Sequence, residues 1–477
     1  MKLSYLLQDT ISNITDDRYV DNIICDLKIC KENDLLFLLN KNSEKEFSSS
    51  SKNVSIVVAG ESYIDNNPNY TLYTVSNPRK TLAFAMYRMY CHHLNGTKFI
   101  GITGTNGKST TALLIKSILS DFGYNVGLIG TANIMFNDKI LSENNYSMTT
   151  PPPKILFPAI KQLIDLGADI IVMEVSSHAL DQDRVSPINF DIGIFTNLSP
   201  EHLDYHKNVD NYFLAKTKLI SQCKRVLVNS DDFYGRLTAM KFNNTESCGI
   251  SRSSDTKIYD IKNNVFYGST FLYESINHSE KFDLSLVGAN NIYNAMMAIR
   301  CAEILEVPIK NIKNSIKKIK SINGRFEIIN ERPMIVIDYA HTSQAFENTL
   351  FFLNSSKNTE QKIIVVFGCG GERDKSKRYT MGKIADKYAD AIILTSDNPR
   401  GEDPLNIIEE IAAGITRAPY KILDRQEAIR TAIKKASKND IVAIIGKGPE
   451  KYTIINKTYF PFNEREIVLD ALSEFNV

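Results

Sequence analysis

The fold of this chain is decided by Phe99-Ile-Gly-Ile-Thr-Gly-Thr-Asn-Gly-Lys-Ser-Thr110, an apolar run that ends in glycines, a lysine and two hydroxyl residues. Apolar residues then recur at helical spacing, at Leu114, Ile115, Ile118, Leu119 and Phe122. Gly123 follows as a helix stop signal. A strand, a glycine-rich loop and a helix in this order predict a cradle for the phosphates of a nucleotide.

The loop has the residue types that phosphate binding requires. Gly104 and Gly107 let the backbone turn tightly, Lys108 can reach the terminal phosphates, and the hydroxyl of Ser109 can hold Mg²⁺. The strict pattern G-x-x-x-x-G-K-(S/T) is not met, because Ile102 stands where its first glycine would be. A turn that only connects a strand to a helix would leave the Gly-Lys-Ser run unexplained, so we interpret the loop as a phosphate cradle.

Length and charge limit the classes of protein that this chain could be. Its 477 residues are enough for about three domains. With 56 basic and 55 acidic residues the net charge is +1, so the charge favours neither nucleic acid nor a membrane as a partner. The absence of a signal peptide or an apolar run of membrane-spanning length favours a cytoplasmic enzyme. The seven cysteines form no C-x-x-C pair, which favours reduced thiols.

The first 96 residues contain short apolar runs at 35–39 and 55–58 between polar stretches, and predict a small α/β domain. A helical pattern at 81–90 precedes the turn Asn95-Gly96, the predicted domain boundary. For His92 and His93, between them, a solvated helix end is favoured over a metal site, because no third ligand has suitable spacing.

Residues 97–325 alternate apolar strands with helices, which predicts a largely parallel sheet covered on both faces. A strand at 169–173 ends at Glu174, a carboxylate placed to hold Mg²⁺, although a surface acid that only ends a strand is the alternative. A strand at 191–195 leads into a loop rich in His, Asp and Glu, in which His202 is the candidate ligand of a second metal ion. The next helix carries Lys216.

Residues 326–477 repeat the alternation, with apolar strands at 334–337, 362–367, 391–394 and 441–445, and predict a separate Rossmann-like α/β domain. Its loop Gly368-Cys-Gly-Gly-Glu-Arg373 lacks the third glycine of a dinucleotide fingerprint, which disfavours an NAD site. An anion-binding face for small carboxylates is predicted instead, with a solvated basic surface as the alternative. Its residues are Arg373, Lys375, Lys377, Arg378 and Arg400.

Seven motifs follow one another along the chain: T-G-T-N-G-K-S, E-V-S-S-H-A-L, T-N-L-S-P-E-H-L-D-Y-H, A-K, G-A-N-N-I-Y-N, N-G-R-F-E and D-Y-A-H-T. Together they resemble the Mur ligases, and among these the MurE branch, which adds the third amino acid of the peptidoglycan stem. The resemblance covers roughly residues 100 to 452 and rests on the motifs jointly.

The resemblance implies three domains, with residues 1–96 for a UDP-sugar, 97–325 for ATP and 326–477 for the incoming amino acid. It implies an ATP site of Gly104, Thr105, Asn106, Gly107, Lys108, Ser109, Thr110, Asn291, Arg325 and Asp338. The implied catalytic residues are Lys108, Glu174, His202 and Lys216. Mg²⁺ would associate with Ser109, Glu174, His202 and Lys216, the last as a carbamate (N6-carboxylysine). The acceptor, UDP-MurNAc-dipeptide, would contact Thr149, Thr150, Ser176, Gln182 and Arg184.

The implied reaction is the ATP-dependent formation of an amide bond in peptidoglycan precursor synthesis. The terminal carboxylate of the acceptor attacks the γ-phosphate of ATP, and the amine of the amino acid then displaces phosphate from the acyl phosphate. Asp397-Asn-Pro-Arg400 matches the signature of members that use diaminopimelate. Diaminopimelate has one carboxylate more than lysine, and a guanidinium can bind that carboxylate bidentately. Matched positions around this amino acid are Arg373, Asp397, Asn398, Pro399, Arg400, Gly446 and Glu450. We expect a monomer with small-molecule partners.

The chain departs from the family pattern at two motifs, and the downstream D-G-containing loop of the family has no clear counterpart in residues 40–47. Asp26-Leu27-Lys28 stands where MurE ligases usually carry D-S-R, and Pro449 stands where they usually carry histidine in G-K-G-H-E. The first departure leaves open a paralogue that acts on a different peptidyl carboxylate.

Other classes share part of the pattern. A P-loop phosphotransferase or NTPase would not require a carboxylate-binding third domain. A non-catalytic nucleotide-binding protein would not need Glu174, His202 and Lys216 together. The D-N-P-R signature argues against a folate polyglutamyl ligase.

Overall fold

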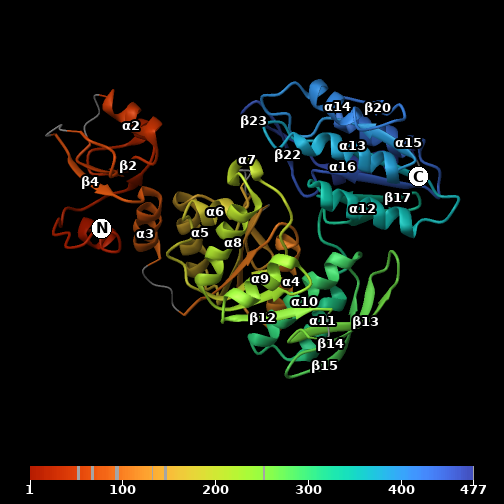
Figure 1. Ribbon diagram of the computed structural model, residues 1–477, viewed down its shortest axis with the longest axis horizontal. Helices are drawn as coiled ribbons and strands as arrows, with labels where there is room; N and C mark the ends of the chain where they lie inside the picture. The colour runs from red at the N-terminus through yellow and green to blue at the C-terminus, as the bar shows by residue number, and fades with distance from the viewer. Residues whose placement is uncertain are drawn as a thin grey trace.

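The computed structural model describes residues 1–50, 54–65, 69–91, 96–131, 133–143, 148–250 and 253–475. These residues form an N-terminal, a central and a C-terminal part, each around its own main sheet, in red to orange, orange to green and teal to blue in Figure 1. The arrangement confirms the predicted α/β class. His92, His93 and Asn95, for which we predicted a helix end and a turn, lie outside the described residues.

The N-terminal part is a small parallel sheet with helices on it. Its elements are α1 (Leu3–Leu7), β1 (Ile23–Ile24), the 3₁₀ turn η1 (Leu27–Ile29), β2 (Leu35–Phe37), α2 (Lys41–Ser48), β3 (Ile56–Gly60), β4 (Thr71–Val75) and α3 (Pro78–Tyr90). The strand order is β1-β2-β3-β4. Strand β2 is apolar and fully buried, as expected of a parallel strand covered on both faces. Helix α3 begins where Asn77 caps it and proline occupies its first turn.

The central part is a large mixed sheet. Its elements are β5 (Lys98–Thr103), α4 (Lys108–Phe122), β6 (Val126–Ile129), β7 (Asn133–Phe136), β8 (Lys139–Glu143), α5 (Pro153–Asp165), β9 (Ile170–Glu174), α6 (Ser177–Asp181), β10 (Phe190–Phe195), α7 (Leu203–His206), α8 (Val209–Ser221), β11 (Cys223–Asn229), α9 (Phe233–Lys241), β12 (Thr245–Gly249), β13 (Thr256–Asn263), β14 (Ser269–Glu274), β15 (Ser279–Leu284), α10 (Ala289–Ile304) and α11 (Ile309–Lys318). The strand order is β15-β14-β13-β12-β11-β10-β5-β9-β6-β7-β8.

The strands from β13 to β6 along this order are parallel, as predicted, but both ends of the sheet are antiparallel. Hairpins β13-β14-β15 and β6-β7-β8 continue the sheet there. In β14 buried and half-buried residues alternate, which is typical of an antiparallel strand with one solvated face. The predicted alternation of strands and helices does not hold over these hairpins.

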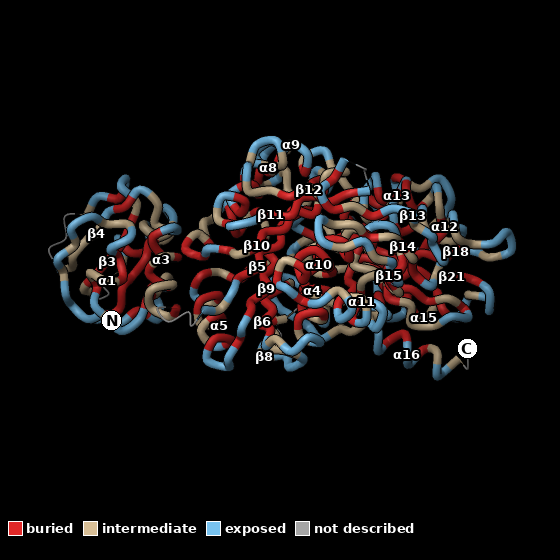
Figure 2. The backbone as a smooth tube through the Cα atoms, turned by 90° about the horizontal axis from the view of Figure 1, so that it is seen from below, coloured by how far each residue is buried: buried red, intermediate tan, exposed pale blue. Residues whose placement is uncertain are grey.

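The topology brings the phosphate loop and Glu174 to one edge of the sheet. Strands β10, β5 and β9 are parallel neighbours, so their carboxyl ends lie side by side. Figure 2 shows these three strands buried in the middle of the central part. Helix α4 begins at this edge and directs the positive end of its dipole there. In open α/β sheets this edge is where ligands bind.

The C-terminal part is a second, smaller α/β unit. Its elements are β16 (Glu327–Glu331), β17 (Met334–Asp338), α12 (Ser343–Ser356), β18 (Ile363–Phe367), α13 (Ser376–Tyr388), β19 (Ala391–Leu394), α14 (Pro404–Ala412), β20 (Tyr420–Lys421), α15 (Arg425–Lys435), β21 (Ile441–Ile445), β22 (Tyr452–Ile455), β23 (Thr458–Pro461) and α16 (Glu464–Phe475). The main sheet has the order β16-β17-β21-β18-β19-β20, antiparallel at β16 and parallel elsewhere. This agrees with the predicted Rossmann-like character.

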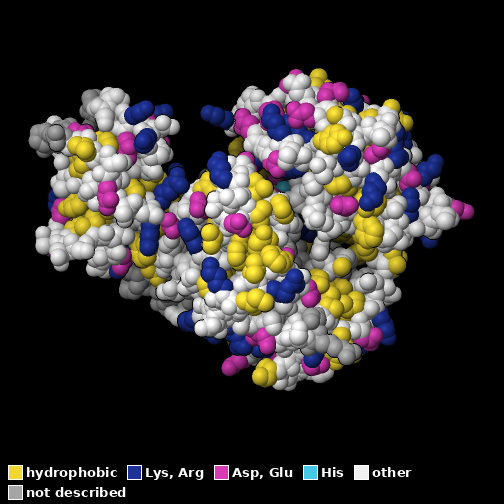
Figure 3. Space-filling model, in the orientation of Figure 1, with side chains coloured by type: hydrophobic (Ala, Val, Ile, Leu, Met, Phe, Trp, Pro, Cys, Tyr) yellow, Lys and Arg dark blue, Asp and Glu magenta, His cyan; other side chains and the backbone are white. Residues whose placement is uncertain are grey.

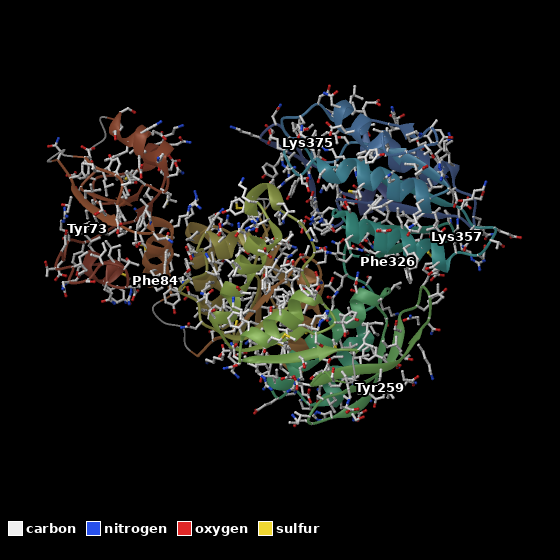
Figure 4. The ribbon with its side chains drawn as sticks, in the orientation of Figure 1. Tyr73, Phe84, Tyr259, Phe326, Lys357 and Lys375 are labelled. Atoms are coloured by element: carbon white, nitrogen blue, oxygen red, sulfur yellow. The ribbon has the colours of Figure 1, made fainter. Side chains whose placement is uncertain are left out.

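Polar contacts join the parts. Asn77 Nδ2 donates to Asp183 Oδ2 at 2.8 Å between the N-terminal and central parts. Arg325, in the linker before the C-terminal part, donates from Nη2 to Ser109 Oγ at 3.0 Å. Figure 4 places Phe326 at this junction. The linker therefore lies directly against the phosphate loop.

The cysteines agree with the prediction of reduced thiols. Each of the seven cysteines is a free thiol, and all but Cys25 are buried. Burial raises the pKa of Cys25 to about 11, so its thiol is protonated at neutral pH. In the part of the chain that the structure describes, no helix is both long and apolar enough to cross a membrane.

Candidate active site

The phosphate loop depends on glycine at two positions. Gly104 has a φ of 144° and Gly107 a φ of 88°, which side chains rarely allow. A side chain at Gly104 would collide with Thr196 Oγ1, and one at Gly107 with Asn294 Oδ1. The loop is therefore enclosed between the end of β10 and helix α10.

Hydrogen bonds from the segment after β10 hold the rest of the loop. Asn106 N donates to Asn197 Oδ1 at 3.0 Å, and Asn197 Nδ2 donates back to Asn106 O at 3.1 Å. The hydroxyls of Thr105 and Tyr212 lie 3.1 Å apart. Thr110 is buried in the first turn of α4. The predicted loop residues are thus held by hydrogen bonds to the segment after β10 and to α8.

Two lysines converge on one carbonyl of this loop. Lys108 Nζ donates to Gly104 O and Thr105 O, each at 2.9 Å, and Lys216 Nζ donates to Gly104 O at 2.8 Å. Burial lowers the pKa of both ammonium groups. For Lys216 the pKa falls well below its usual value, because the charge of Lys108 adds to the effect of burial. Such a pair favours an anion nearby, or a neutral amine at Lys216.

Glu174 is a buried carboxylate beside the phosphate loop, with 3% of its surface exposed. Its Oε2 accepts from Ser109 Oγ at 2.8 Å, and its Oε1 accepts from Thr131 N at 2.9 Å. The structure thus brings together Ser109 and Glu174, two of the predicted metal-associated residues. One carboxylate and one hydroxyl fit Mg²⁺, which usually takes its other ligands from substrate phosphates and water.

Glu201 organises a second group of polar residues. His341 Nε2 of the C-terminal part lies 3.3 Å from Glu201 Oε1, and His202 Nε2 lies 3.8 Å from Oε2. Burial alone would raise the pKa of Glu201, but the two histidines hold it well below its usual range. Burial lowers the pKa of His202 to about 3, although Glu201 opposes the shift, so the imidazole is neutral at pH 7.

The predicted metal-associated residues are divided between the two groups. Within the described residues, no set of three or more His, Cys, Asp or Glu is arranged to hold a metal ion. His202 and Lys216 lie in the group around Glu201, whose charge acts on both. His202 also packs edge-on against His178, with ring centres 4.8 Å apart.

The predicted nucleotide-contacting residues outside the loop lie at its two sides. Asn291 is in the first turn of α10. The guanidinium of Arg325, which also reaches the serine of the loop, lies 4.3 Å from the ring centre of Tyr339. Asp338 Oδ1 accepts from the backbone N–H of Phe326 at 3.2 Å and of Tyr339 at 2.8 Å. Asp338 therefore fixes the segment that carries Arg325.

The predicted acceptor-binding residues form one hydrogen-bonded group at the end of β9. Thr150 Oγ1 donates to the last carbonyl of β9 at 2.9 Å and accepts from Ser176 N at 2.9 Å. Arg184 donates from Nη1 to Thr150 O at 2.6 Å and from Nη2 to Gln182 Oε1 at 2.8 Å. Thr149 lies beside them, and its Oγ1 is 3.3 Å from the hydroxyl of Thr131, which also contacts Glu174. The residues predicted to bind the acceptor and the residues predicted to hold the metal are thus neighbours.

The D-N-P-R loop presents a half-buried arginine. Arg400 has a φ of 52° and donates from Nη1 to Gly371 O at 2.8 Å and to Asn398 O at 3.4 Å. The carbonyl of Pro399 packs against Gly371. Burial, and then the charge of Arg373, lower the pKa of Arg400. A carboxylate between the two guanidinium groups would relieve their repulsion.

An acid lies at the other side of this loop. Asn398 Nδ2 donates to Glu450 Oε2 at 2.8 Å, and Asn398 Oδ1 accepts from the buried Lys447 at 3.0 Å. Burial would raise the pKa of Asp397, but basic neighbours, Lys447 first, lower it. Gly446 leaves room beside this carboxylate, since an added Cβ would lie 3.1 Å from Asp397 Oδ2. Basic and acidic groups thus face one loop, as an amino acid with both charges requires.

The predicted anion-binding face is wrong for Arg378. This side chain is fully buried and donates to Glu402 at 3.0 Å and Glu410 at 2.8 Å. Lys375 also pairs with Glu402, at 3.0 Å. The sequence indicates that these residues are basic, but not that one acid of the loop before α14 and one acid of α14 neutralise them. Pro449, the second departure from the family pattern, lies against the linker, where a side chain at Gly324 would collide with it.

Three residues of the site were missed by the sequence analysis. Glu201 and His341 stand inside the motifs that include His202 and Asp338, so a motif signal existed, but nothing indicated that they meet. Thr131 follows β6 in a short connection that carries no motif, and only the fold places it on Glu174.

The departure Asp26-Leu27-Lys28 lies at a pocket of the N-terminal part of about 310 Å³. Asp26 caps η1 by accepting from Lys28 N at 2.9 Å. The pocket is lined by Cys25, Asp26, Leu27, Lys28, Leu36, Leu38, Ser43 and Glu46. Figure 3 shows an open hollow between the N-terminal and C-terminal parts, with Lys and Arg side chains along its edges. An anionic molecule could extend from this part to the central part.

Comparisons with known proteins identify relatives over most of the chain. The Mur ligase middle domain matches residues 102–302, and the Mur ligase glutamate ligase domain matches residues 324–448. A UDP-N-acetylmuramoyl-L-alanyl-D-glutamate--2,6-diaminopimelate ligase of Alkaliphilus oremlandii (strain OhILAs) is 40% identical over 410 residues, which are 84% of this chain and 83% of that protein. The ligase of the same name from Clostridium tetani (strain Massachusetts / E88) is 36% identical over 99% of this chain and 100% of its own length. A solved structure of a ligase of this name superposes over both whole chains with a TM-score of 0.69 and 26% identity.

Proposed function

The chain belongs to the Mur ligase family, and from this premise we propose that it joins 2,6-diaminopimelate to the D-glutamate of UDP-N-acetylmuramoyl-L-alanyl-D-glutamate, using ATP. The observation that carries the proposal is the similarity, over nearly the whole chain, to ligases of that name. We assign the uridine end of the acceptor to residues 1–96, ATP to 97–325 and the amino acid to 326–477.

In the first step the acceptor carboxylate attacks the γ-phosphate of ATP. A bond forms between a carboxylate oxygen and phosphorus, the bond from that phosphorus to the bridging oxygen breaks, and ADP leaves. Two anions must approach each other, and Lys108, the loop N–H groups and Arg325 offset their repulsion. The contact of Arg325 with Ser109 supports this assignment, because it brings the linker to the phosphate site.

Mg²⁺ held by Ser109 and Glu174 would neutralise charge on the phosphoryl oxygens. Lys216, if its neutral amine takes up CO₂, becomes a carbamate that replaces a positive by a negative group beside Lys108. Its depressed pKa supports this modification, because only the neutral amine reacts.

In the second step the free amine of diaminopimelate attacks the acyl carbon and phosphate leaves. Water must be excluded, because it would hydrolyse the acyl phosphate. The contact of His341 with Glu201 supports a site that closes between the central and C-terminal parts.

The choice of diaminopimelate over lysine follows from charge. Arg400 and Arg373 favour the extra carboxylate of diaminopimelate, whereas the ammonium of lysine beside them would be repelled. Glu450 suits the ammonium group at the same end.

Mass spectrometry of the products tests the proposal. The chain is incubated with ATP, the UDP-dipeptide acceptor, lysine and the diaminopimelate isomers, and we expect a diaminopimelate adduct and phosphate release only when acceptor is present. Arg400→Ala should lose discrimination against lysine, whereas Arg417→Ala, which removes a surface pair with Asp386, should keep it. Comparable specificity constants for lysine and diaminopimelate in the unmodified chain would contradict the proposed substrate, and phosphate release without acceptor would indicate an NTPase.

A further inference from the structure

Glu174 is held by a residue that belongs to none of the motifs. We propose that Thr131 is a positioning residue of the active site, which fixes the carboxylate of Glu174 for Mg²⁺ and ties it to Thr149 of the acceptor site. The inference rests on the proposed function for the identity of the acceptor, but not for the binding of Mg²⁺ and nucleotide.

Thr131 contacts both oxygens of the carboxylate. Its backbone N–H donates to Glu174 Oε1 at 2.9 Å, and its hydroxyl donates to Oε2 at 3.1 Å. Ser109 Oγ donates to the same Oε2 at 2.8 Å. The carboxylate plane is thus held from two sides, which leaves a single orientation relative to the phosphate loop.

The hydroxyl of Thr131 also has a second neighbour, Thr149 Oγ1 at 3.3 Å. A hydroxyl has one proton, and the carboxylate of Glu174 can only accept. The hydroxyl of Thr131 is the donor in both contacts, so its single proton is shared between Glu174 Oε2 at 3.1 Å and Thr149 Oγ1 at 3.3 Å. Thr131 thereby joins the residues of the proposed acceptor site to those of the metal site.

The side chains of Thr131 and Glu174 have limited conformational freedom. The segment of Thr131 follows β6, which pairs with β9, the strand that ends in Glu174. Gly130 lies against the same carboxylate, where a side chain would collide with Glu174 Oε1. Since Mg²⁺ demands near-ideal geometry, a carboxylate held in one orientation binds it with less loss of side-chain entropy. Loss of the hydroxyl bond would release that orientation.

The test removes the hydroxyl and keeps the volume. Thr131→Val is compared with Thr131→Ser, which keeps the hydroxyl. Thr131→Ala, which also lacks the hydroxyl, is the second variant in case Thr131→Val misfolds. Thr256→Val is the matched control, because Thr256 Oγ1 also donates to a buried glutamate of the central part, Glu246 Oε1, at 2.9 Å. Calorimetry measures binding of a non-hydrolysable ATP analogue as a function of Mg²⁺ concentration, without acceptor.

We expect the half-saturating Mg²⁺ concentration to rise about tenfold in Thr131→Val and Thr131→Ala, to return close to the original value in Thr131→Ser, and to stay unchanged in Thr256→Val. In turnover, the KM of the acceptor should rise more than kcat falls in the first two variants. An unchanged Mg²⁺ dependence in a folded Thr131→Val or Thr131→Ala would overturn the proposal, as would the same change in Thr256→Val. The calorimetric result does not depend on ligation of diaminopimelate, so failure of the proposed function is detected separately.

Discussion

The ammonium of Lys216 is enclosed by protein, with 1% of the residue exposed, one carbonyl within hydrogen-bond distance and the ring of Tyr212 4.6 Å away. No carboxylate contacts this ammonium among the hydrogen bonds and ion pairs of the described residues. A charged amine is therefore unfavourable there, whereas the proposed carbamate would carry a negative charge that the ammonium of Lys108 attracts.

We predict that Lys216→Ala abolishes turnover and that short-chain carboxylates restore part of it, because they can occupy the place of the carbamate. The rate of ADP formation with acceptor present is the measurement. Lys218→Ala is the control, since this half-exposed lysine of the same helix donates to Leu180 O at 3.2 Å. Full activity of Lys216→Ala would exclude the carbamate.

His178 makes stability depend on pH. Burial, followed by the charges of His206 and Arg184, lowers the pKa of His178 to about 4 from its ordinary 6.5. Between these values the unfolded chain binds a proton that the folded chain does not, so the free energy of unfolding falls as the pH falls from about 6.5 to about 4. We predict a lower thermal unfolding midpoint at pH 5 than at pH 7, and a smaller difference in His178→Gln. Equal pH dependence in both proteins would contradict this assignment.

At the scale of elements, helix α4 has a left-handed glycine at each end, with different surroundings. Gly107 precedes the helix at a φ of 88° and is enclosed by Asn294, whereas Gly123 follows it at a φ of 113° with no atom within 4 Å of an added Cβ. A side chain would therefore strain the backbone at both positions, but it would collide with a neighbouring side chain only at Gly107.

We predict that Gly107→Ala loses measurable ATP binding, because the loop must move to accommodate a side chain. Gly123→Ala should bind ATP normally and lose only about 1 to 2 kcal/mol of stability, the cost of a left-handed residue with a side chain. Calorimetric titration with ATP and thermal unfolding measure the two effects. Retained nucleotide affinity in Gly107→Ala would show that the loop does not depend on this glycine.

At the scale of the whole molecule, we propose that two parts bind the acceptor. The residues matched to its dipeptide end are joined by hydrogen bonds at the end of β9. The uridine end would reach the N-terminal part, where Leu27 stands in place of the serine of D-S-R. Loss of one hydrogen bond to a charged diphosphate costs about 1.5 to 3 kcal/mol, roughly ten- to a hundredfold in affinity.

We predict that this chain prefers the UDP-bearing acceptor over the same dipeptide-sugar without UDP. The preference should be weaker than in a ligase that carries D-S-R. The ratio of the two specificity constants is the measurement. Leu27→Ser should increase the ratio through the UDP form alone, with the form that lacks UDP as the internal control. A ratio as large as in a D-S-R enzyme would show that other residues of the pocket compensate.

The sequence by itself determined the local features of this protein. The phosphate loop with α4, the strand ending at Glu174 and the strands at 391–394 and 441–445 were predicted, because apolar periodicity and glycine depend on neighbours in the chain. The order of the motifs likewise indicated the family. The hairpins β13-β14-β15 and β6-β7-β8 were missed, because short alternating runs do not tell which edge of a sheet they extend.

Only the tertiary structure decided which side chains meet. The contact of His341 with Glu201 joins residues 140 positions apart, and the contacts of Thr131 with Glu174 depend on the pairing of β6 with β9. The burial of Arg378 depends on acids from another element. The depressed pKa of Lys216 is of the same kind, since desolvation is a property of everything packed around a group. Sequence gives the type of each group, and packing gives its neighbours and its dielectric surroundings.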